Sequence, residues 1–415
     1  MMKKSTLHRT VTATHMNGMT DIVIKSLTTG PLLTAYVLSF GVGNVMLGFL
    51  QAVVPLFCFL HVFVACFLER GVSPKKIACI SSVLSRPFLL LMGIALLCQT
   101  KPFGFGLFAC SYILFYILVA ITGGAFWPWC KQLVPHRLMS AFFAQRLRYI
   151  LSVKIIVVTG ATLFLAFLSV AQPDWQTTIY AVFLFVAFGV GIFYTYTLFQ
   201  MSDVQLKRCM DIPFRHKVIR VLKKKSFLSL LFKLGVGNFA FALFTPFSIA
   251  FLMKGLKLSV VDCMIYFILS SCTDIVFISF WKKRIQLNLS KVIAQSLLLM
   301  MSGSCVFACL ACTPSVPVYM LLTIAAILTG IGSAGINLGI SDASVSYVPH
   351  QMSSVYIAVV NIARFGFTAL GTFLAGVTVE VLTRYTTNHW FYFFIMTSVI
   401  FVGSTLFVRQ IKPVS

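Results

Sequence analysis

The chain has 415 residues, of which 59% are hydrophobic and only 10% are charged, and its net charge is +24 at pH 7. Soluble domains average about 25% charged residues, so this composition excludes a soluble protein. The basic residues fall in short clusters between apolar runs of about 20 residues. That pattern indicates a membrane protein with positive loops and argues against nucleic-acid binding.

The first half of the chain carries six long apolar segments. They lie at residues 18–40, 45–68, 77–98, 103–126, 149–171 and 178–199. Each is long enough to cross a bilayer about 30 Å thick as a helix, and none alternates as a membrane β-strand does. The sequence therefore predicts six spanning helices, with the polar segment 131–148 as a cytoplasmic connection outside them.

A basic, poorly hydrophobic segment at 201–226 divides the chain, and it ends in Lys223-Lys224-Lys225. Such a segment cannot lie in hydrocarbon. Six more apolar segments follow, at 227–253, 260–281, 292–312, 316–340, 353–379 and 386–408. We predict an all-α membrane protein of about twelve transmembrane helices, with six-helix halves at 1–200 and 227–415 and a cytoplasmic linker between them.

Lys and Arg residues concentrate in alternate loops. The turn at 69–76, the segment 131–148 and the linker hold many of them, whereas the connections on the opposite side hold few. Because basic residues of short loops stay on the cytoplasmic side, we predict that both termini are cytoplasmic.

An internal repeat supports the division into halves. Residues 133–140 and 347–354 share a Val-Pro-His core and follow the fourth and tenth spans, and the same spacing aligns Glu69-Arg70 with Lys283-Arg284. Two loops that agree on one spacing indicate two related halves in parallel orientation, with a cavity expected between them.

The turn Glu69-Arg70-Gly71 with the basic residues Lys75 and Lys76 resembles the loop between helices two and three of the major facilitator superfamily. The helix four-to-five region 123–148 is also similar to that of bacterial members. The resemblance implies an alternating-access transporter with a small-molecule substrate, expected as a monomer in a bacterial inner membrane. It makes Glu69, Arg70 and Arg137 candidates for a cytoplasmic gate.

Ionisable residues inside the spans are the candidates for the mechanism, because each costs about 2.5–3.5 kcal/mol to insert. Arg364 lies about 16 Å into its predicted span, near the membrane midplane, and Arg86 is nearly as deep. Asp274 could pair with Arg364 or leave it to face a substrate. Asp21 and Lys25 are four residues apart and are expected to neutralise each other near the cytoplasmic end of the first span.

Asn238 and Asn337 are further polar candidates for substrate binding. With Arg86 and Arg364 set against Asp274, the deep charges are net positive, so an organic anion is the expected substrate. The alternative is a non-transporting sensor or assembly protein on the same fold.

An enzyme is not expected, because the few acidic residues form no paired carboxylates. Cys305, Cys309 and Cys312 share one helix face, where helix packing explains them better than a metal. No metal, cofactor or nucleic-acid partner is predicted, and a coupling ion is left open.

Overall fold

The structure, a computed structural model, describes residues 4–98, 100–133, 136–171, 175–203, 219, 223, 225–285, 287–312, 317–346 and 353–409. Every regular element within these residues is a helix. Twelve of the helical segments are long and apolar enough to cross a membrane, which confirms the predicted all-α membrane fold. The chain is therefore an integral membrane protein. By its internal contacts it divides into two compact units.

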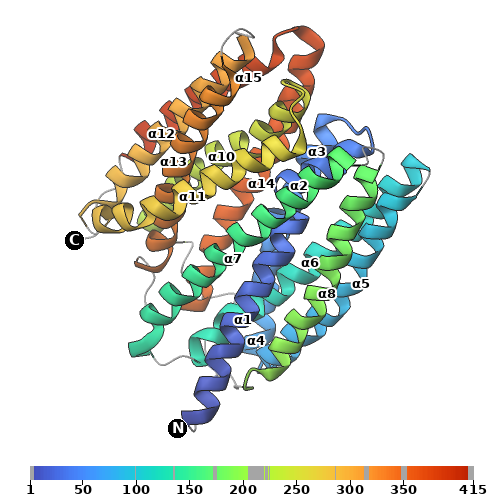
Figure 1. The fold of residues 1–415 in the computed structure, drawn as a ribbon. Helices are drawn as coiled ribbons and strands as arrows, with labels where there is room; N and C mark the ends of the chain where they lie inside the picture. The colour runs from blue at the N-terminus through green and yellow to red at the C-terminus, as the bar shows by residue number, and fades with distance from the viewer. Residues whose placement is uncertain are drawn as a thin grey trace. The chain divides into compact units, whose positions relative to one another are not determined.

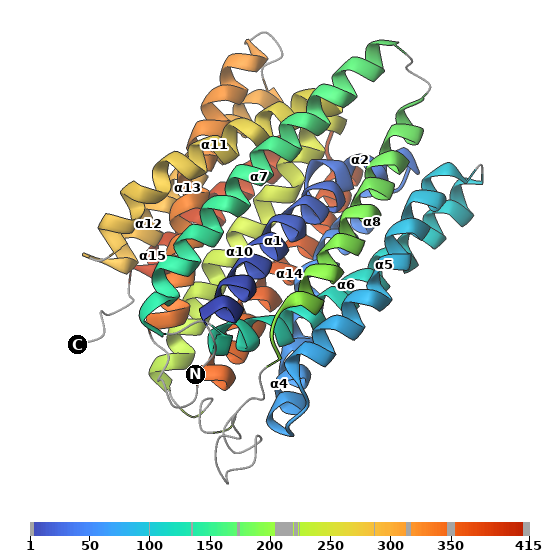
Figure 2. The same cartoon turned by 60° about the horizontal axis from the view of Figure 1, so that its bottom comes forward.

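Unit 1 comprises residues 1–41 and 57–217. Its helices are α1 (Lys4–Thr28), α2 (Pro31–Ser39), the 3-10 turn η1 (Phe57–Phe59), α4 (Leu60–Glu69), α5 (Pro74–Leu97), α6 (Lys101–Leu133), α7 (His136–Ala171) and α8 (Gln176–Gln200). Helix α5 packs against α6 on one side and α8 on the other, and α1 packs against α8 and α7. Figures 1 and 2 show α5, α6 and α8 side by side.

Unit 2 comprises residues 42–56 and 218–415. Its helices are α3 (Asn44–Leu56), α10 (Lys225–Lys254), α11 (Val260–Ile285), α12 (Leu289–Cys312), α13 (Val318–Ser346), α14 (Ser353–Tyr385) and α15 (His389–Val408). Helix α12 packs against α13 and α15, while α14 packs against α10 and α3. Aromatic rings fill the core: Phe244, Phe307 and Phe394 lie with ring centroids 5.2–6.0 Å apart.

The first span is interrupted, which the sequence did not lead us to expect. Helix α1 ends at Thr28, and Gly30 adopts a φ of 67°, a conformation that suits glycine and ends a right-handed helix. Pro31 then starts α2, because proline is pre-organised for the first helical position. The apolar span runs from Thr10 to Ser39, so it also begins earlier than predicted.

The second span is divided between the two units. Its first part, α3, belongs to unit 2, whereas η1 and α4 belong to unit 1. Helix α3 lies close against α14 because Gly48 and Gly376 meet there: a Cβ built on Gly376 would fall 2.7 Å from the carbonyl oxygen of Asn44. Lys254 Nζ also donates to Asn44 Oδ1 at 2.7 Å. Small residues allow such close helix approach in membranes.

Most of the segment 131–148, expected as a cytoplasmic connection between two spans, is helical. Helix α6 continues to Leu133 and α7 begins at His136, so only residues 134 and 135 separate them. Much of the Val-Pro-His repeat, and residues 204–218 of the linker, lie outside the described residues.

Candidate functional site

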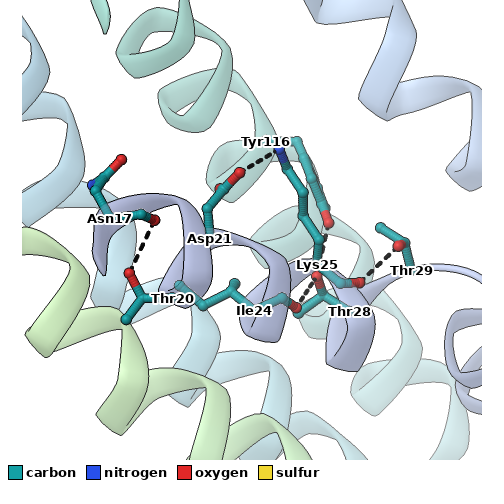
Figure 3. A network of polar contacts seen from close by, with 8 residues as sticks. All are labelled: Asn17, Thr20, Asp21, Ile24, Lys25, Thr28, Thr29 and Tyr116. Atoms are coloured by element: carbon teal, nitrogen blue, oxygen red, sulfur yellow. Dashed lines mark hydrogen bonds and ion pairs between the residues drawn. The ribbon is translucent and has the colours of Figure 1, made fainter. Parts of the chain in front are cut away.

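An ion pair lies close to the middle of the first span. Lys25 Nζ is 2.7 Å from Asp21 Oδ2, one helical turn apart on α1 (Figure 3). Both residues lie within the candidate span Thr10–Ser39. The two side chains are 45% and 32% exposed, so other helices leave this charged face of α1 partly uncovered.

Hydrogen bonds fix α1 just beyond the ion pair. Thr28 Oγ1 donates to the carbonyl oxygen of Ile24 at 2.8 Å and lies 2.8 Å from the hydroxyl of Tyr116 on α6. On the other side of the pair, Asn17 Nδ2 donates to Thr197 Oγ1 of α8 at 3.4 Å. The charged face is therefore held between two helices of the same unit, as Figure 3 shows for Tyr116.

Arg86 is a buried cation of unit 1. It lies at the centre of α5, about 18 Å from Pro74 along the helix, and is only 6% exposed. Its Nη2 donates to Ser82 Oγ at 2.9 Å and its Nε to Thr195 Oγ1 at 3.2 Å, while its guanidinium lies 4.7 Å from the Tyr194 ring centroid. These neutral groups orient the guanidinium without cancelling its charge.

The third guanidinium nitrogen of Arg86, Nη1, is not used by the hydrogen bonds to Ser82 and Thr195. Within the described part of the chain, Nη1 has no hydrogen-bond partner, and it is not among the polar atoms sealed from solvent. No carboxylate among the described residues lies within ion-pair distance of Arg86 either. The side chain thus offers an oriented, accessible donor.

Glycine on α8 makes room for this arrangement. A Cβ built on Gly191 would lie 2.7 Å from Arg86 Cδ and 3.2 Å from Nη1, closer than side chains normally pack. Thr195 Oγ1 donates to the carbonyl oxygen of Gly191 at 3.0 Å, so Ser82 is left to donate to Thr195 across a 2.7 Å contact. Both hydroxyl oxygens can then accept from the guanidinium.

Asp21 links these charges electrostatically. Its carboxylate acts on Arg86, Arg146 and the hydroxyl of Tyr194 in addition to its pair with Lys25. The polar cluster of unit 1, made by Asp21, Lys25, Arg86 and Arg146, therefore holds one carboxylate and three cations. The cluster carries an excess of positive charge that an anion could balance.

Arg146 is buried although the sequence suggested a connection there. It is 5% exposed on α7, its Nη1 donates to the carbonyl oxygen of Thr14, and its guanidinium lies 5.0 Å from the Phe126 ring centroid. Gly18 on α1 provides the space, because a Cβ there would fall 2.8 Å from the guanidinium carbon. Arg146 Nε and both ring nitrogens of His15 are buried without a partner among the described residues.

The predicted gate residues lie at a well-defined turn. Glu69 ends α4 and is half-buried, whereas Arg70 is exposed. Gly71 adopts a φ of 91°, which explains the glycine that the resembling motif also has. The side chain of Arg137 lies outside what the structure describes. The gating role of all three residues stays a prediction.

The predicted site residues of unit 2 are more dispersed. Asn238 is buried, but its amide donates to the carbonyl oxygen of Leu234 in its own helix at 2.9 Å. Asn337 is exposed, and Asp274 and Arg364 are half-buried. Arg364 lies about 16 Å along α14 from its start at Ser353. The Arg364–Asp274 pair stays a prediction.

Several residues in or beside the polar cluster were given little weight, or were not identified, from the sequence. Asp21 and Lys25 were expected only to cancel, although an acid–base pair four residues apart inside an apolar span is itself a signal. Tyr194 and Thr195 carry no such signal, because a hydroxyl in a spanning helix usually bonds its own backbone. Groups of three or more His, Cys, Asp or Glu that could hold a metal do not occur among the described residues.

No protein-family model and no curated protein matches the chain. Its structure, however, is similar to solved transporter structures. The nucleoside transporter NupG has a TM-score of 0.69 at 13% identity, over 97% of this chain and 99% of that one. The D-xylose-proton symporter has a TM-score of 0.74 at 12% identity, over 98% of each chain.

A bacterial homologue of the human lysosomal transporter Spinster, inward-facing and unoccupied, has a TM-score of 0.70 at 12% identity, over 99% of this chain and 98% of that one. These likenesses extend over nearly the full length and accompany twelve candidate spans. The chain thus has the fold of the major facilitator superfamily transporters, as the resemblance in its loops predicts.

Proposed function

We propose that this protein transports a small solute with an anionic group across a membrane by alternating access. The fold supports transport, since the similar structures are named as transporters of nucleosides and xylose and as a homologue of a lysosomal transporter. As the sequence predicts, we place it in a bacterial inner membrane with cytoplasmic termini.

The observation that supports an anionic substrate is the environment of the Arg86 guanidinium. A guanidinium in a low-dielectric interior needs a counter-charge, and here its described partners are two hydroxyls and an aromatic face. Asp21, the acid that acts on it electrostatically, is already bonded to Lys25 at 2.7 Å. A carboxylate or phosphate that reached Nη1 would complete the charge balance through a charge-assisted hydrogen bond.

The test compares Arg86→Lys with Arg384→Lys, two changes of the same kind. Arg384 is a suitable control, because its side chain is 75% exposed and its Nη2 lies as far as 4.0 Å from Glu380 Oε1. Both variants would be reconstituted into liposomes and assayed for uptake of a panel of carboxylates and phosphate monoesters.

We expect Arg86→Lys to lose uptake while retaining expression and thermal stability, since lysine cannot keep two separate donors on Ser82 and Thr195. Arg384→Lys should behave as the wild type. Uptake by Arg86→Lys equal to that of Arg384→Lys would contradict the role given to Arg86.

A further inference from the structure

We infer that the turn between α11 and α12 binds the headgroup of an anionic phospholipid in the leaflet that the turn faces. Four cations lie on this basic turn, which is made by Lys282, Lys283, Arg284 and Lys291, and all four are exposed. The sequence holds no Asp or Glu between Asp274 and Asp342, so neither α12 nor the end of α11 can neutralise them.

The side chains of the basic turn have few partners. Arg284 stacks on Phe280, with its guanidinium 4.2 Å from the ring centroid. Within the described part of the chain, Lys282, Lys283 and Lys291 make no side-chain hydrogen bond or ion pair. Their positive charge is therefore available to a ligand from outside the protein.

The described residues on either side of the turn are held by packing and hydrogen bonds, which lowers the entropic cost of binding. Trp281 is buried and donates from Nε1 to the carbonyl oxygen of Ile331 at 2.9 Å, and it packs with Ile285 and Val292. Asn288 closes the turn, because its backbone N–H donates to Arg284 at 3.0 Å and its side chain accepts from the backbone of Lys291 at 3.1 Å. The cations are held on a preformed platform.

Lys291 lies at the end of its helix where the helix dipole disfavours a positive charge. The first turn of α12 carries this lysine and no acid, although the positive end of a helix dipole favours an acidic residue there. An external phosphate would gain from both the lysine and the helix N-terminus. The same turn exposes Leu287 to 86%, as expected for a side chain that enters the acyl region beside the headgroups.

The related turn of unit 1 shows that basic loops of this fold need not stay open. There Lys75 Nζ donates to the carbonyl oxygens of Phe199 and Met201 at 2.8 and 2.7 Å, which caps the end of α8. Ser73 donates to Asp203 at 2.7 Å. Retention of positive charge on one side of the membrane applies to both turns, so it does not explain why Lys75 is bonded in one turn while Lys282, Lys283 and Lys291 are not bonded to any described residue in the other.

The experiment measures lipid binding by the full-length protein in detergent, with phosphatidylglycerol and phosphatidylcholine as probes. Each cation near a membrane surface is worth about fivefold in affinity. A variant with Lys282, Lys283 and Arg284 all changed to Gln should bind phosphatidylglycerol roughly a hundredfold more weakly. Its weak binding of phosphatidylcholine should not change.

The matched control changes Arg70 and Lys76 to Gln, two exposed cations of the unit 1 turn. It should bind phosphatidylglycerol as the wild type does. Lys291→Glu separates lipid binding from stability: it should raise the thermal stability of the lipid-free protein, because it suits the helix dipole, and still weaken phosphatidylglycerol binding.

Three results would overturn the inference. They are equal binding of the two lipids by the wild type, equal loss in the Arg70/Lys76 control, and displacement of the lipid by inorganic phosphate at matching concentration. The last would show a phosphate site rather than a lipid site.

Discussion

Replacing Gly191 by Ala tests the site without removing any polar group. The new Cβ would lie 2.7 Å from Arg86 Cδ, so the arginine must move by about 0.7 Å to reach an ordinary contact of 3.4 Å. The bond from Arg86 Nε to Thr195 is already 3.2 Å long, and this movement would break it. A hydrogen bond to a charged group contributes about 1.5–3 kcal/mol. A free energy of this size corresponds to roughly 10- to 150-fold in the affinity for the anion.

Gly189 provides the matched control on the same helix, because a Cβ there would meet nothing within 4 Å. Both alanines raise helix propensity equally, by about 1 kcal/mol relative to glycine, so that effect cancels. The assay is the KM for anion uptake into liposomes, with thermal stability measured in parallel. Gly191→Ala should raise KM at least about tenfold over Gly189→Ala. Equal KM values would refute the role of Arg86 in binding.

Three further predictions address other parts of the molecule. Neutralising Asp21 or Lys25 alone should lower thermal stability, because the other charge is left unpaired in the membrane, whereas neutralising both should restore much of it. Gly376→Ala should destabilise the protein by about 1–3 kcal/mol, because its Cβ would meet backbone of α3, and Gly366→Ala, which meets nothing within 4 Å, should not. A tag at Ser415 should report a cytoplasmic location in an accessibility assay, and an external location would contradict the predicted orientation.

Much of the fold could be predicted from hydrophobicity alone, because every backbone group in lipid must be bonded within its own helix. The breaks within spans were harder to predict. Gly30 ends α1 because it adopts a positive φ, whereas other glycines, such as Gly191 and Gly376, pack inside helices without ending them. Similarly, the grouping of α3 with unit 2 depends on the meeting of Gly48 and Gly376, which no local pattern reveals.

The site was only partly predictable for the same reason. Charge in an apolar span identified Arg86, Asp21 and Lys25, since burial of charge always needs a cause. Sequence could not show that Arg86 is buried against hydroxyls of α5 and α8 while Arg364 is only half-buried. It also could not show that Arg146 turns inward against Gly18.

The most direct test of the account is the uptake of paired solutes by liposomes that contain the wild-type protein. Each pair would consist of a carboxylate or phosphate monoester and the neutral analogue with the same carbon skeleton. The account predicts saturable uptake of at least one anion, which its neutral analogue neither matches nor inhibits. Saturable uptake of a neutral sugar, a nucleoside or a cation, with no inhibition by any anion of the panel, would contradict it.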